Sequence, residues 1–466
     1  MPRLFGTDGV RGIPGRYPLD EGTVAEIAEA AARVLCNERR SQERQDGQAP
    51  WILLGRDTRD SGRALGRWLV EGFAAAGCRT RDLGVIPTPA VAYLTPRLGA
   101  LAGAVVSASH NPAKFNGVKF FTSDGYKMSP ELEEKVEQGL SPEGQARPRR
   151  RGARAEDAGA AVRRYYEEFL RSTFPASRDL TGLRIVLDCA NGAAARIAPP
   201  LFTGLGAQVL TLGCAPDGRN INSGCGALFP QRMQAAVRRW RADCGVCFDG
   251  DADRAIFADE KGQLLDGDNL LCLAALHLHR HGLLRANKVV LTIMSNFGLI
   301  RFLERRGISV VSVPVGDRNV TEAIDAEGLS LGGEASGHII FRSFSSTGDG
   351  ILTALQTLAA WRECGGRLSG HRQAYRPMPQ LIKNLAVERK FPLERLPRLK
   401  ALVGRCERAL QGEGRILLRY SGTEPLLRIM IEGPSRSRIA TMARQLADAY
   451  LDETGQQSLG GSGLDI

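Results

Sequence analysis

The stretch Trp51-Ile-Leu-Leu-Gly55 is a short apolar run of the kind that forms a buried strand. A helical pattern follows it to about Ala76, and then come Gly77 and a second short strand that ends at Leu83. Glycine is common directly after a helix, because it adopts the left-handed conformation there without strain. The stretch therefore predicts a strand–helix–strand unit, which is the building block of parallel α/β sheets.

The same unit occurs twice more along the chain. The second copy runs from Leu183 to Leu212, with Gly206 after its helix, and the third runs from Lys288 to Val313, with Gly307 in that place. The copies lie too far apart in sequence to form a solenoid. We therefore expect three related α/β domains, each an αβα sandwich.

The part of the chain beyond about residue 380 has a different pattern. Two short strands, Arg415 to Tyr420 and Leu426 to Glu432, precede an amphipathic helix from Arg438 to Leu451, which predicts a smaller C-terminal α+β domain. We expect four domains at residues 1–155, 156–259, 260–378 and 379–455, followed by a disordered tail at 456–466.

The charge balance favours an anionic small molecule as partner. Lysine and arginine number 62 against 51 aspartates and glutamates, a formal net charge of +11. Such an excess suits nucleic acid or an anionic small molecule. Part of it lies in residues 147–154, an arginine run without interleaved aromatic residues or a nucleic-acid motif. We interpret that run as a solvated linker and expect no nucleic-acid partner.

The sequence also predicts where the protein works. No apolar run approaches the roughly 18 residues that cross a membrane, and the first residues lack a basic region followed by an apolar core. Several of the ten cysteines, such as Cys189, lie in apolar strand-like runs, which fits reduced, buried thiols. We expect no membrane partner and a cytoplasmic address.

The first motif with chemical character is Ser107-Ala-Ser-His-Asn-Pro112, which follows the apolar run Leu101 to Val106. Small neighbours let another molecule approach the Ser109 hydroxyl, and Pro112 fixes a turn. The serine is thus expected at a strand end, where open α/β sheets bind their ligands. His110 and Lys119 are candidates to handle protons or bind phosphate.

The second motif, in Phe248-Asp-Gly-Asp-Ala-Asp-Arg254, carries three aspartates at alternate positions. Alternate residues of an extended chain share a face, so Asp249, Asp251 and Asp253 are expected to converge. Two carboxylates 4 Å apart repel by about 4 kcal/mol at an effective dielectric of 20, which calls for a hard divalent cation such as Mg²⁺. A calcium loop ending at Glu260 is the alternative, but residues 255–258 are predicted to form a strand.

Two further motifs indicate sugar and phosphate binding. Gly332-Gly-Glu-Ala-Ser-Gly-His338 allows close backbone approach, and Glu334, Ser336 and His338 are candidates to bind sugar hydroxyls or a proton. Arg419-Tyr-Ser-Gly-Thr-Glu-Pro-Leu-Leu-Arg428 combines a Ser-Gly-Thr turn with flanking arginines, a pattern typical of a phosphate nest.

Two clusters of metal-ligand residue types are not interpreted as metal sites. Cys244 and Cys247 have redox spacing but run into an apolar strand without a second pair, so we interpret them as structural. His277, His279 and His281 alternate at the end of a predicted helix, where helical geometry is expected to splay them apart, so we interpret them as an exposed helix end.

The four motifs, in this order, resemble the α-D-phosphohexomutase superfamily over essentially residues 3–450. Phe5-Gly-Thr-Asp-Gly-Val-Arg-Gly12 and Pro314-Val-Gly-Asp-Arg318 are similar to the branch that acts on glucosamine phosphates. The resemblance implies an isomerase with four domains around a central cleft. It implies interconversion of glucosamine 6-phosphate and glucosamine 1-phosphate through a phosphoserine and a 1,6-bisphosphate, which also acts as activator, on the route to UDP-N-acetylglucosamine and cell-wall precursors. A phosphomannomutase or phosphoglucomutase of the same superfamily is the alternative.

The resemblance also assigns roles to residues. It implies a phosphorylated Ser109, one of whose phosphate oxygens joins Asp249, Asp251 and Asp253 around one Mg²⁺. It further implies three groups of substrate and catalytic residues: Glu334, Ser336 and His338 for the sugar; Arg419, Ser421, Gly422, Thr423 and Arg428 for the distal phosphate; and Arg11, Lys119 and His338 for proton handling and charge. His110, beside Ser109, is kept as a catalytic candidate from its own motif.

Charge counting adds Arg254 to this set. Three aspartates and a phosphoserine carry more negative charge than Mg²⁺ cancels, so Arg11, Lys119 and Arg254 are expected nearby. Three positions depart from the family pattern. Tyr420 replaces a usual proline, which is expected to loosen the phosphate loop. Ala335 stands where glutamine or methionine is common, and Ala227 where serine is more usual. The sequence leaves open whether the chain acts as a monomer or a homodimer.

Overall fold

The computed structural model describes residues 4–6, 8–40, 49–140, 152–421, 425–457 and 464–465. The chain forms two compact units, one of Met1–Met294 with Ile308–Ala374 and one of Ser295–Gly307 with Tyr375–Ile466. Most of the predicted arginine-rich linker and of the predicted tail lies outside the described residues. Within the described part, no helix combines the length and the apolar character needed to cross a membrane.

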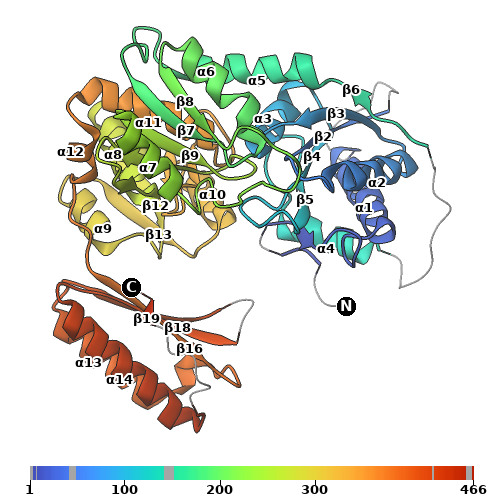
Figure 1. Ribbon diagram of the computed structural model, residues 1–466. Helices are drawn as coiled ribbons and strands as arrows, with labels where there is room; N and C mark the ends of the chain where they lie inside the picture. Colours follow the sequence, from blue (N-terminus) through green and yellow to red (C-terminus); the bar gives the residue numbers. More distant parts are fainter. Residues whose placement is uncertain are drawn as a thin grey trace. The chain divides into compact units, whose positions relative to one another are not determined.

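The first sheet of the larger unit has helices on both faces (Figure 1). Its strand order is β1-β5-β4-β2-β3-β6. The strands are β1 Val10–Gly12, β2 Trp51–Arg56, β3 Arg79–Val85, β4 Ala102–Val106, β5 Asn116–Phe121 and β6 Glu156–Asp157. The helices α1 Glu21–Arg40, α2 Gly62–Ala75 and α4 Pro130–Gln138 share an apolar core with alternate residues of β2, β4 and β5. Helix α3, Thr88–Arg97, contacts the same central strands, and Val91 faces Gly103 of β4.

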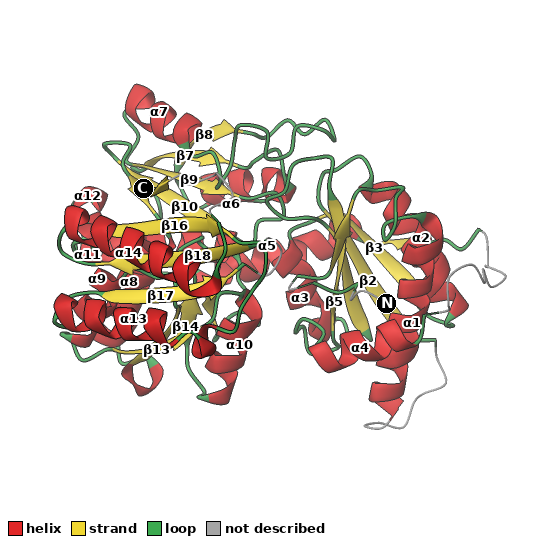
Figure 2. Cartoon of the chain, turned by 90° about the horizontal axis from the view of Figure 1, so that it is seen from below, coloured by secondary structure: helices red, strands yellow, loops and turns green. Residues whose placement is uncertain are grey.

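The second and third sheets of this unit follow a similar plan. The second has the order β11-β10-β9-β7-β8 and the third the order β13-β12-β14-β15. Their strands are β7 Arg184–Asp188, β8 Gln208–Leu212, β9 Cys244–Phe248, β10 Ala255–Asp259, β11 Leu264–Leu265, β12 Lys288–Thr292, β13 Ser309–Val313, β14 Leu331–Gly333 and β15 Ile339–Phe341. Their helices are α6 Ala198–Gly204, α7 Gln231–Trp240, α8 Gly267–Arg280, α10 Asp317–Ala326, α11 Gly350–Cys364 and α12 Leu368–Arg372 (Figure 2). Helix α5, Gly159–Thr173, contacts β3 of the first sheet as well as α11.

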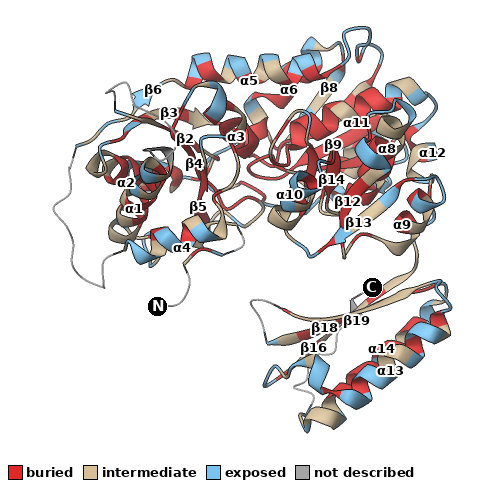
Figure 3. Cartoon of the chain, turned by 180° about the vertical axis from the view of Figure 1, so that it is seen from behind, coloured by how far each residue is buried: buried red, intermediate tan, exposed pale blue. Residues whose placement is uncertain are grey.

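The smaller unit contains an antiparallel sheet covered on one face. Its order is β17-β18-β16-β19, from β16 Gln380–Ala386, β17 Arg415–Tyr420, β18 Leu426–Glu432 and β19 Leu464–Asp465. Helices α13 Pro397–Leu410 and α14 Arg436–Thr454 bury one side against it and expose the other (Figure 3). Helix α9, Phe297–Glu304, also belongs to this unit. The predicted smaller α+β domain is confirmed.

The three predicted strand–helix–strand units are also confirmed. The strand pairs β2–β3, β7–β8 and β12–β13 are parallel, as expected for such units. Gly77, Gly206 and Gly307 follow the intervening helices with φ values of +82°, +98° and +75°. Each of these glycines therefore ends its helix in the left-handed backbone conformation, as the sequence predicted.

The sheets differ from the prediction in one respect, because each parallel core carries an antiparallel pair. The pairs are β4–β5, β9–β10 and β14–β15. A parallel pair needs a crossover of a dozen or more residues, and the segments 107–115, 249–254 and 334–338 are too short to provide one. Each of the first three chemical motifs is therefore a hairpin loop. The strands that flank the fourth motif, β17 and β18, are antiparallel as well.

The close packing of α1 on α2 gives a stability prediction. A Cβ atom on Gly72 would lie 2.2 Å from the Ala25 carbonyl oxygen and 2.6 Å from the Ala28 Cβ, whereas one on Gly66 would meet only Leu54 Cδ2 at 3.6 Å. We expect Gly72→Ala to lower the unfolding free energy by about 1–3 kcal/mol through overpacking. Gly66→Ala in the same helix is the matched control and should be neutral or stabilising by up to about 1 kcal/mol. Calorimetric unfolding of both variants checks this, and equal melting temperatures would contradict it.

Candidate active site

Ser109 occupies a strained position in the β4–β5 loop. It is 1% exposed and has a φ of +49°, which a residue with a Cβ rarely adopts. Its Oγ donates to Asp249 Oδ2 at 2.6 Å and lies 3.3 Å from His110 Nδ1. Such strain persists only where surrounding contacts enforce it, and it is common at functional sites.

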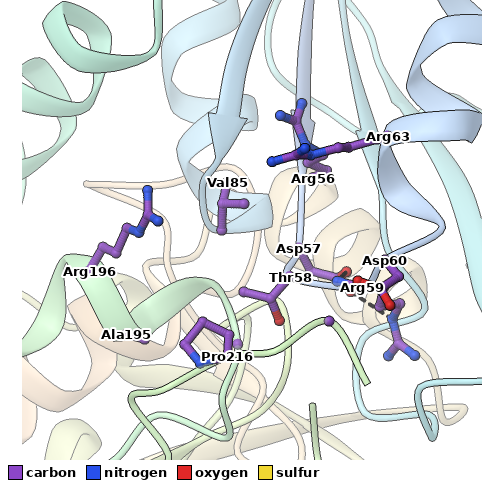
Figure 4. A pocket seen from close by; sticks show the side chains of 12 residues that line it. Arg56, Asp57, Thr58, Arg59, Asp60, Arg63, Val85, Ala195, Arg196 and Pro216 are labelled. Carbon is purple, nitrogen blue, oxygen red and sulfur yellow. Dashed lines mark hydrogen bonds and ion pairs between the residues drawn. The ribbon is translucent and has the colours of Figure 1, made fainter. Parts of the chain in front are cut away.

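The contacts that enforce this loop conformation centre on Arg59, which sequence reasoning missed. Its buried guanidinium donates to the carbonyl oxygens of Ser109, Asn111, Pro112 and Phe115 at 2.6–3.0 Å. Its Nε donates to Asp57 Oδ2 at 2.8 Å, and Figure 4 shows this pair on the wall of a cavity of about 360 Å³. One cation thus replaces the hydrogen bonds that four loop carbonyls would make with water.

The amide of Ser109 is held by the same buried network. The Asp57 carboxylate accepts from Ser107 Oγ at 2.7 Å, and Ser107 Oγ in turn accepts from the Ser109 amide at 2.9 Å. From the loop between β8 and α7, Asn222 Nδ2 donates to the Ser109 carbonyl oxygen at 2.9 Å. A Cβ on Gly250 would lie 2.6 Å from that oxygen, so glycine there allows the two hairpin loops to meet.

The three predicted aspartates converge, as their spacing indicates. Asp249, Asp251 and Asp253 are buried, and each offers a carboxylate oxygen within 4.8 Å of the others. Burial, followed by the charges of the other two carboxylates, raises the pKa of Asp249 well above its ordinary value. Asp251 Oδ1 and Asp253 Oδ1 are buried without a hydrogen-bond partner among the described residues. Crowded carboxylates with orphaned oxygens can bind a metal, and a hard cation suits this donor set.

The calcium-loop alternative is excluded by the same geometry. Residues 255–259 form β10, as predicted, and pair with β9. Glu260, the residue that would close a calcium loop, instead accepts from Ser369 Oγ at 2.6 Å.

Two of the predicted cations, Lys119 and Arg254, lie beside the aspartates. Lys119 Nζ lies 3.1 Å from Asp251 Oδ2 and 2.9 Å from Asp8 Oδ2, in a position that is 2% exposed. Burial alone would lower the pKa of Lys119, but Asp251, Asp8 and Asp253 raise it above its ordinary value. Lys119 therefore stays charged. Arg254 Nε lies 3.7 Å from Asp253 Oδ1.

A cavity of about 360 Å³ opens beside these charges. Five residues identified from the sequence line it, namely Arg11, His110, Arg254, Glu334 and His338, together with Asp253 of the triad. Burial lowers the pKa of His110 to about 4, with the charges of Arg254 and Arg11 acting in the same direction. His110 is therefore a neutral imidazole at pH 7, close to the Ser109 hydroxyl.

A second set of residues at this cavity was missed. Asp8 and Asp317 line it, and Lys127 pairs with both, at 2.7 Å to Asp8 Oδ1. Asp8 and Asp317 stand inside motifs that the sequence analysis quoted, Phe5–Gly12 and Pro314–Arg318. Their presence inside these two quoted strings was the sequence signal that could have identified them. Nothing about Lys127 distinguishes it in the sequence.

The predicted sugar loop connects β14 to β15. Glu334 accepts from the Gly316 amide at 2.8 Å and from Ser336 Oγ at 3.1 Å. His338 is 2% exposed, accepts from the Gly348 amide at 3.1 Å through Nε2, and places Nδ1 3.6 Å from Asp253 Oδ2. His338 thus links the sugar loop to the aspartates.

The predicted phosphate loop belongs to the smaller unit. Arg419 and Arg428 stand directly opposite each other on β17 and β18, and Ser421 is buried at the end of β17. Burial and then the charge of Arg428 lower the pKa of Arg419, which is the effect expected when like charges face each other. Gly422 and Thr423 lie outside the described residues.

Two residues beside this loop were not anticipated in these roles. Lys390, which sequence reasoning did not single out, donates to the Ser421 carbonyl oxygen at 2.6 Å. The Tyr420 hydroxyl donates to the Phe391 carbonyl oxygen at 2.7 Å, accepts from the Phe391 amide at 3.0 Å and contacts the Tyr450 hydroxyl at 2.9 Å. These bonds fix the Tyr420 side chain. The expectation of a looser phosphate loop concerns residues 422–424, which lie outside the described residues.

Comparison with known proteins covers nearly the whole chain. Residues 2–147, 163–262 and 266–378 match the phosphoglucomutase/phosphomannomutase alpha/beta/alpha domains I, II and III, and residues 382–449 match the C-terminal domain. The chain is 42% identical over 466 residues to the phosphoglucosamine mutase of Geotalea daltonii, covering 99% of this chain and 100% of that protein.

Solved structures share the fold. A phosphoglucomutase/phosphomannomutase family protein from Burkholderia thailandensis has a TM-score of 0.75 at 23% identity, covering 100% of this chain and 99% of that chain. N-acetylphosphoglucosamine mutase of Aspergillus fumigatus, in complex with GlcNAc-6P and magnesium, has a TM-score of 0.60 at 21% identity, covering 89% of this chain and 85% of that chain.

These four matching domains and the four sequence motifs define a phosphohexomutase, an isomerase that relocates a phosphoryl group on a hexose. The chain belongs to the phosphoglucomutase/phosphomannomutase family.

The aspartate triad gives a metal-binding prediction. We expect Asp251→Asn to weaken Mg²⁺ binding at least about tenfold, or about 1.4 kcal/mol, because it removes one of three converging charges. Asp60→Asn, on an exposed loop of the same unit, is the matched control and should bind like the wild type. Calorimetric titration with MgCl₂ measures both. Equal affinities in the wild type and Asp251→Asn would show that the triad does not hold the metal.

Proposed function

We propose that the protein interconverts glucosamine 6-phosphate and glucosamine 1-phosphate through a phosphorylated Ser109 and glucosamine 1,6-bisphosphate. The observation that carries the proposal is the Ser109 Oγ, held 2.6 Å from Asp249 in a strained and buried loop. The phosphoglucosamine mutase of Geotalea daltonii, and the complex of the Aspergillus fumigatus enzyme with GlcNAc-6P and magnesium, support the substrate class.

Asp249, Asp251 and Asp253, with one oxygen of the phosphorylated Ser109, are proposed to hold one Mg²⁺. The bound ion supplies charge neutralisation and orientation of the phosphoryl group. The orphaned oxygens of Asp251 and Asp253 support this assignment. Thr88 Oγ1, which donates to Asp251 Oδ2 at 2.7 Å, orients that carboxylate from outside.

The reaction is proposed to use Ser109 twice. Its phosphoryl group passes to the 1-hydroxyl of glucosamine 6-phosphate, so the Ser109 O–P bond breaks as the sugar O–P bond forms. The bisphosphate then turns by half a turn, and Ser109 takes back the phosphoryl group from the 6-position. When glucosamine 1-phosphate dissociates, Ser109 is phosphorylated again. Added bisphosphate is needed only by chains that have lost this phosphoryl group, and in that sense it acts as an activator.

The pKa values of the site residues indicate which of them stabilise charge and which move a proton. The raised pKa of Lys119 suits it to stabilising transferred charge rather than accepting a proton, and Arg11 and Arg254 are proposed to share this task. His110, neutral at pH 7 and 3.3 Å from Ser109 Oγ, and His338 are the proposed groups for moving the hydroxyl proton.

The substrate is proposed to bind through its two ends. Arg419, Ser421, Gly422, Thr423 and Arg428 take the distal phosphate, which would relieve the repulsion between facing Arg419 and Arg428. Ser336, His338 and Glu334 take the sugar, and the Glu334 carboxylate is the proposed acceptor for the 2-ammonium group. Lys390 is a further cation beside the phosphate loop.

The remaining expectations complete the proposal. We keep the domain limits 1–155, 156–259, 260–378 and 379–455, which the family matches support apart from an overlap at 260–262. We keep the cytoplasmic address, which buried thiols such as those of Cys189 and Cys244 support. The proposal holds for a monomer or a homodimer, since all its residues come from one chain.

Ser109→Ala should abolish mutase turnover, because no other hydroxyl is proposed to carry the phosphoryl group. Ser107→Ala is the matched control: it loosens the loop by removing the bond to the Ser109 amide, so turnover should fall but persist. Coupled assays measure turnover, and peptide mass spectra locate the phosphate. Substantial turnover in Ser109→Ala would refute the covalent role.

The choice of sugar separates this proposal from a phosphomannomutase or phosphoglucomutase. A site built around a polar substituent rejects substrates that lack it, because its buried groups are left unpaired. We expect kcat/KM for glucosamine 6-phosphate to exceed the values for glucose and mannose 6-phosphates by at least about tenfold, or about 1.4 kcal/mol. Coupled assays with the three sugars side by side decide it, and a higher value for either rival would assign the chain to that branch.

A further inference from the structure

Two histidines and a glutamate come together at the ends of two packed helices. Helix α8 contacts α11, and His277 and the C-terminal cap His281 of α8 face Glu363 in the last turn of α11. Ligand atoms of the three side chains all lie within 4.8 Å of one another. His281 Nε2 is 2.5 Å from Glu363 Oε1.

The expectation that the helix would splay its three histidines is wrong for two of them. Residues four apart share one face of a helix, and the rings of His277 and His281 have centroids 4.8 Å apart. His279 is directed elsewhere, with Nδ1 3.0 Å from Asn287 Oδ1. The cluster therefore contains two histidines rather than three.

The protonation states in the cluster suit a metal ion. Burial lowers the pKa of His277, which keeps its imidazole neutral at pH 7. The hydrogen bond from His281 lowers the pKa of Glu363, which keeps its carboxylate charged. His277 Nδ1 is buried and has no hydrogen-bond partner among the described residues.

A partner outside the cluster orients the carboxylate. Arg178 Nη2 lies 3.5 Å from Glu363 Oε2, on the oxygen that His281 does not contact. Oε1 is thereby directed to the histidines, as outer partners orient ligands in metal sites.

We propose that His277, His281 and Glu363 form a Zn²⁺ site that joins the end of α8 to the end of α11. Two imidazoles and one carboxylate are a ligand set that zinc accepts, with water in the fourth position. The set is distinct in kind from the aspartate triad, since imidazole favours Zn²⁺ whereas carboxylates alone favour Mg²⁺. The site would add a cross-link between two helices of the larger unit.

Calorimetric titration of tag-free protein with ZnCl₂, in the presence of excess Mg²⁺ to occupy the triad, tests the proposal. We expect one zinc per chain, and at least about tenfold weaker binding in His281→Gln and in His277→Gln. His279→Gln, on the same helix, is the matched control and should bind zinc like the wild type. Unchanged affinity in both His281→Gln and His277→Gln would overturn the proposal.

Thermal unfolding gives a second readout that does not involve the mutase reaction. Zinc should raise the melting temperature of the wild type and of His279→Gln, because it binds the folded state, and should leave His281→Gln unchanged. The same zinc-dependent shift in His281→Gln would also overturn the site. Neither measurement uses substrate, so the proposed function can fail while the zinc site holds, and the reverse.

Discussion

The burial of three aspartates in one place is the constraint on which the larger unit depends. Two carboxylates about 4 Å apart repel by about 4 kcal/mol at an effective dielectric of 20, and here three are buried. The charges of the aspartates are balanced by Lys119 from the first sheet, Arg254 from the β9–β10 loop and His338 from the β14–β15 loop. The neutralisation of one cluster thus brings together charged groups from all three α/β domains of the larger unit.

The hairpins explain how loops from separate domains reach one site. Each sheet of the larger unit keeps a parallel core, and the antiparallel strand added to it turns the chain back at the edge that bears the motif. Arg59 then fixes the first of these loops by holding four of its carbonyl oxygens. Asn222 holds it from the second domain, and the absence of a Cβ at Gly250 leaves room for the approach. The strained φ of Ser109 is held from both sides.

The sequence predicted the fold class, the three parallel strand–helix–strand units and the convergence of Asp249, Asp251 and Asp253. These depend on local spacing, on apolar periodicity and on the glycine after each helix, which a sequence displays directly. It did not predict the antiparallel pairs, because a short apolar strand has the same pattern in either orientation. It misjudged His277 and His281, because their alternation with His279 obscured the spacing of four residues that places them on one face.

The sequence by itself therefore determined which residues carry chemistry within each motif, since that chemistry follows from residue type and local order. Only the tertiary structure decided which charged residues from distant segments balance the charges of these motif residues. Lys127 joins Asp8 to Asp317, and Arg59 joins Asp57 to the Ser109 loop, through contacts between residues far apart in the chain. The free energy of a buried charge depends on every group within a few ångströms, and proximity in space is set by folding rather than by sequence order.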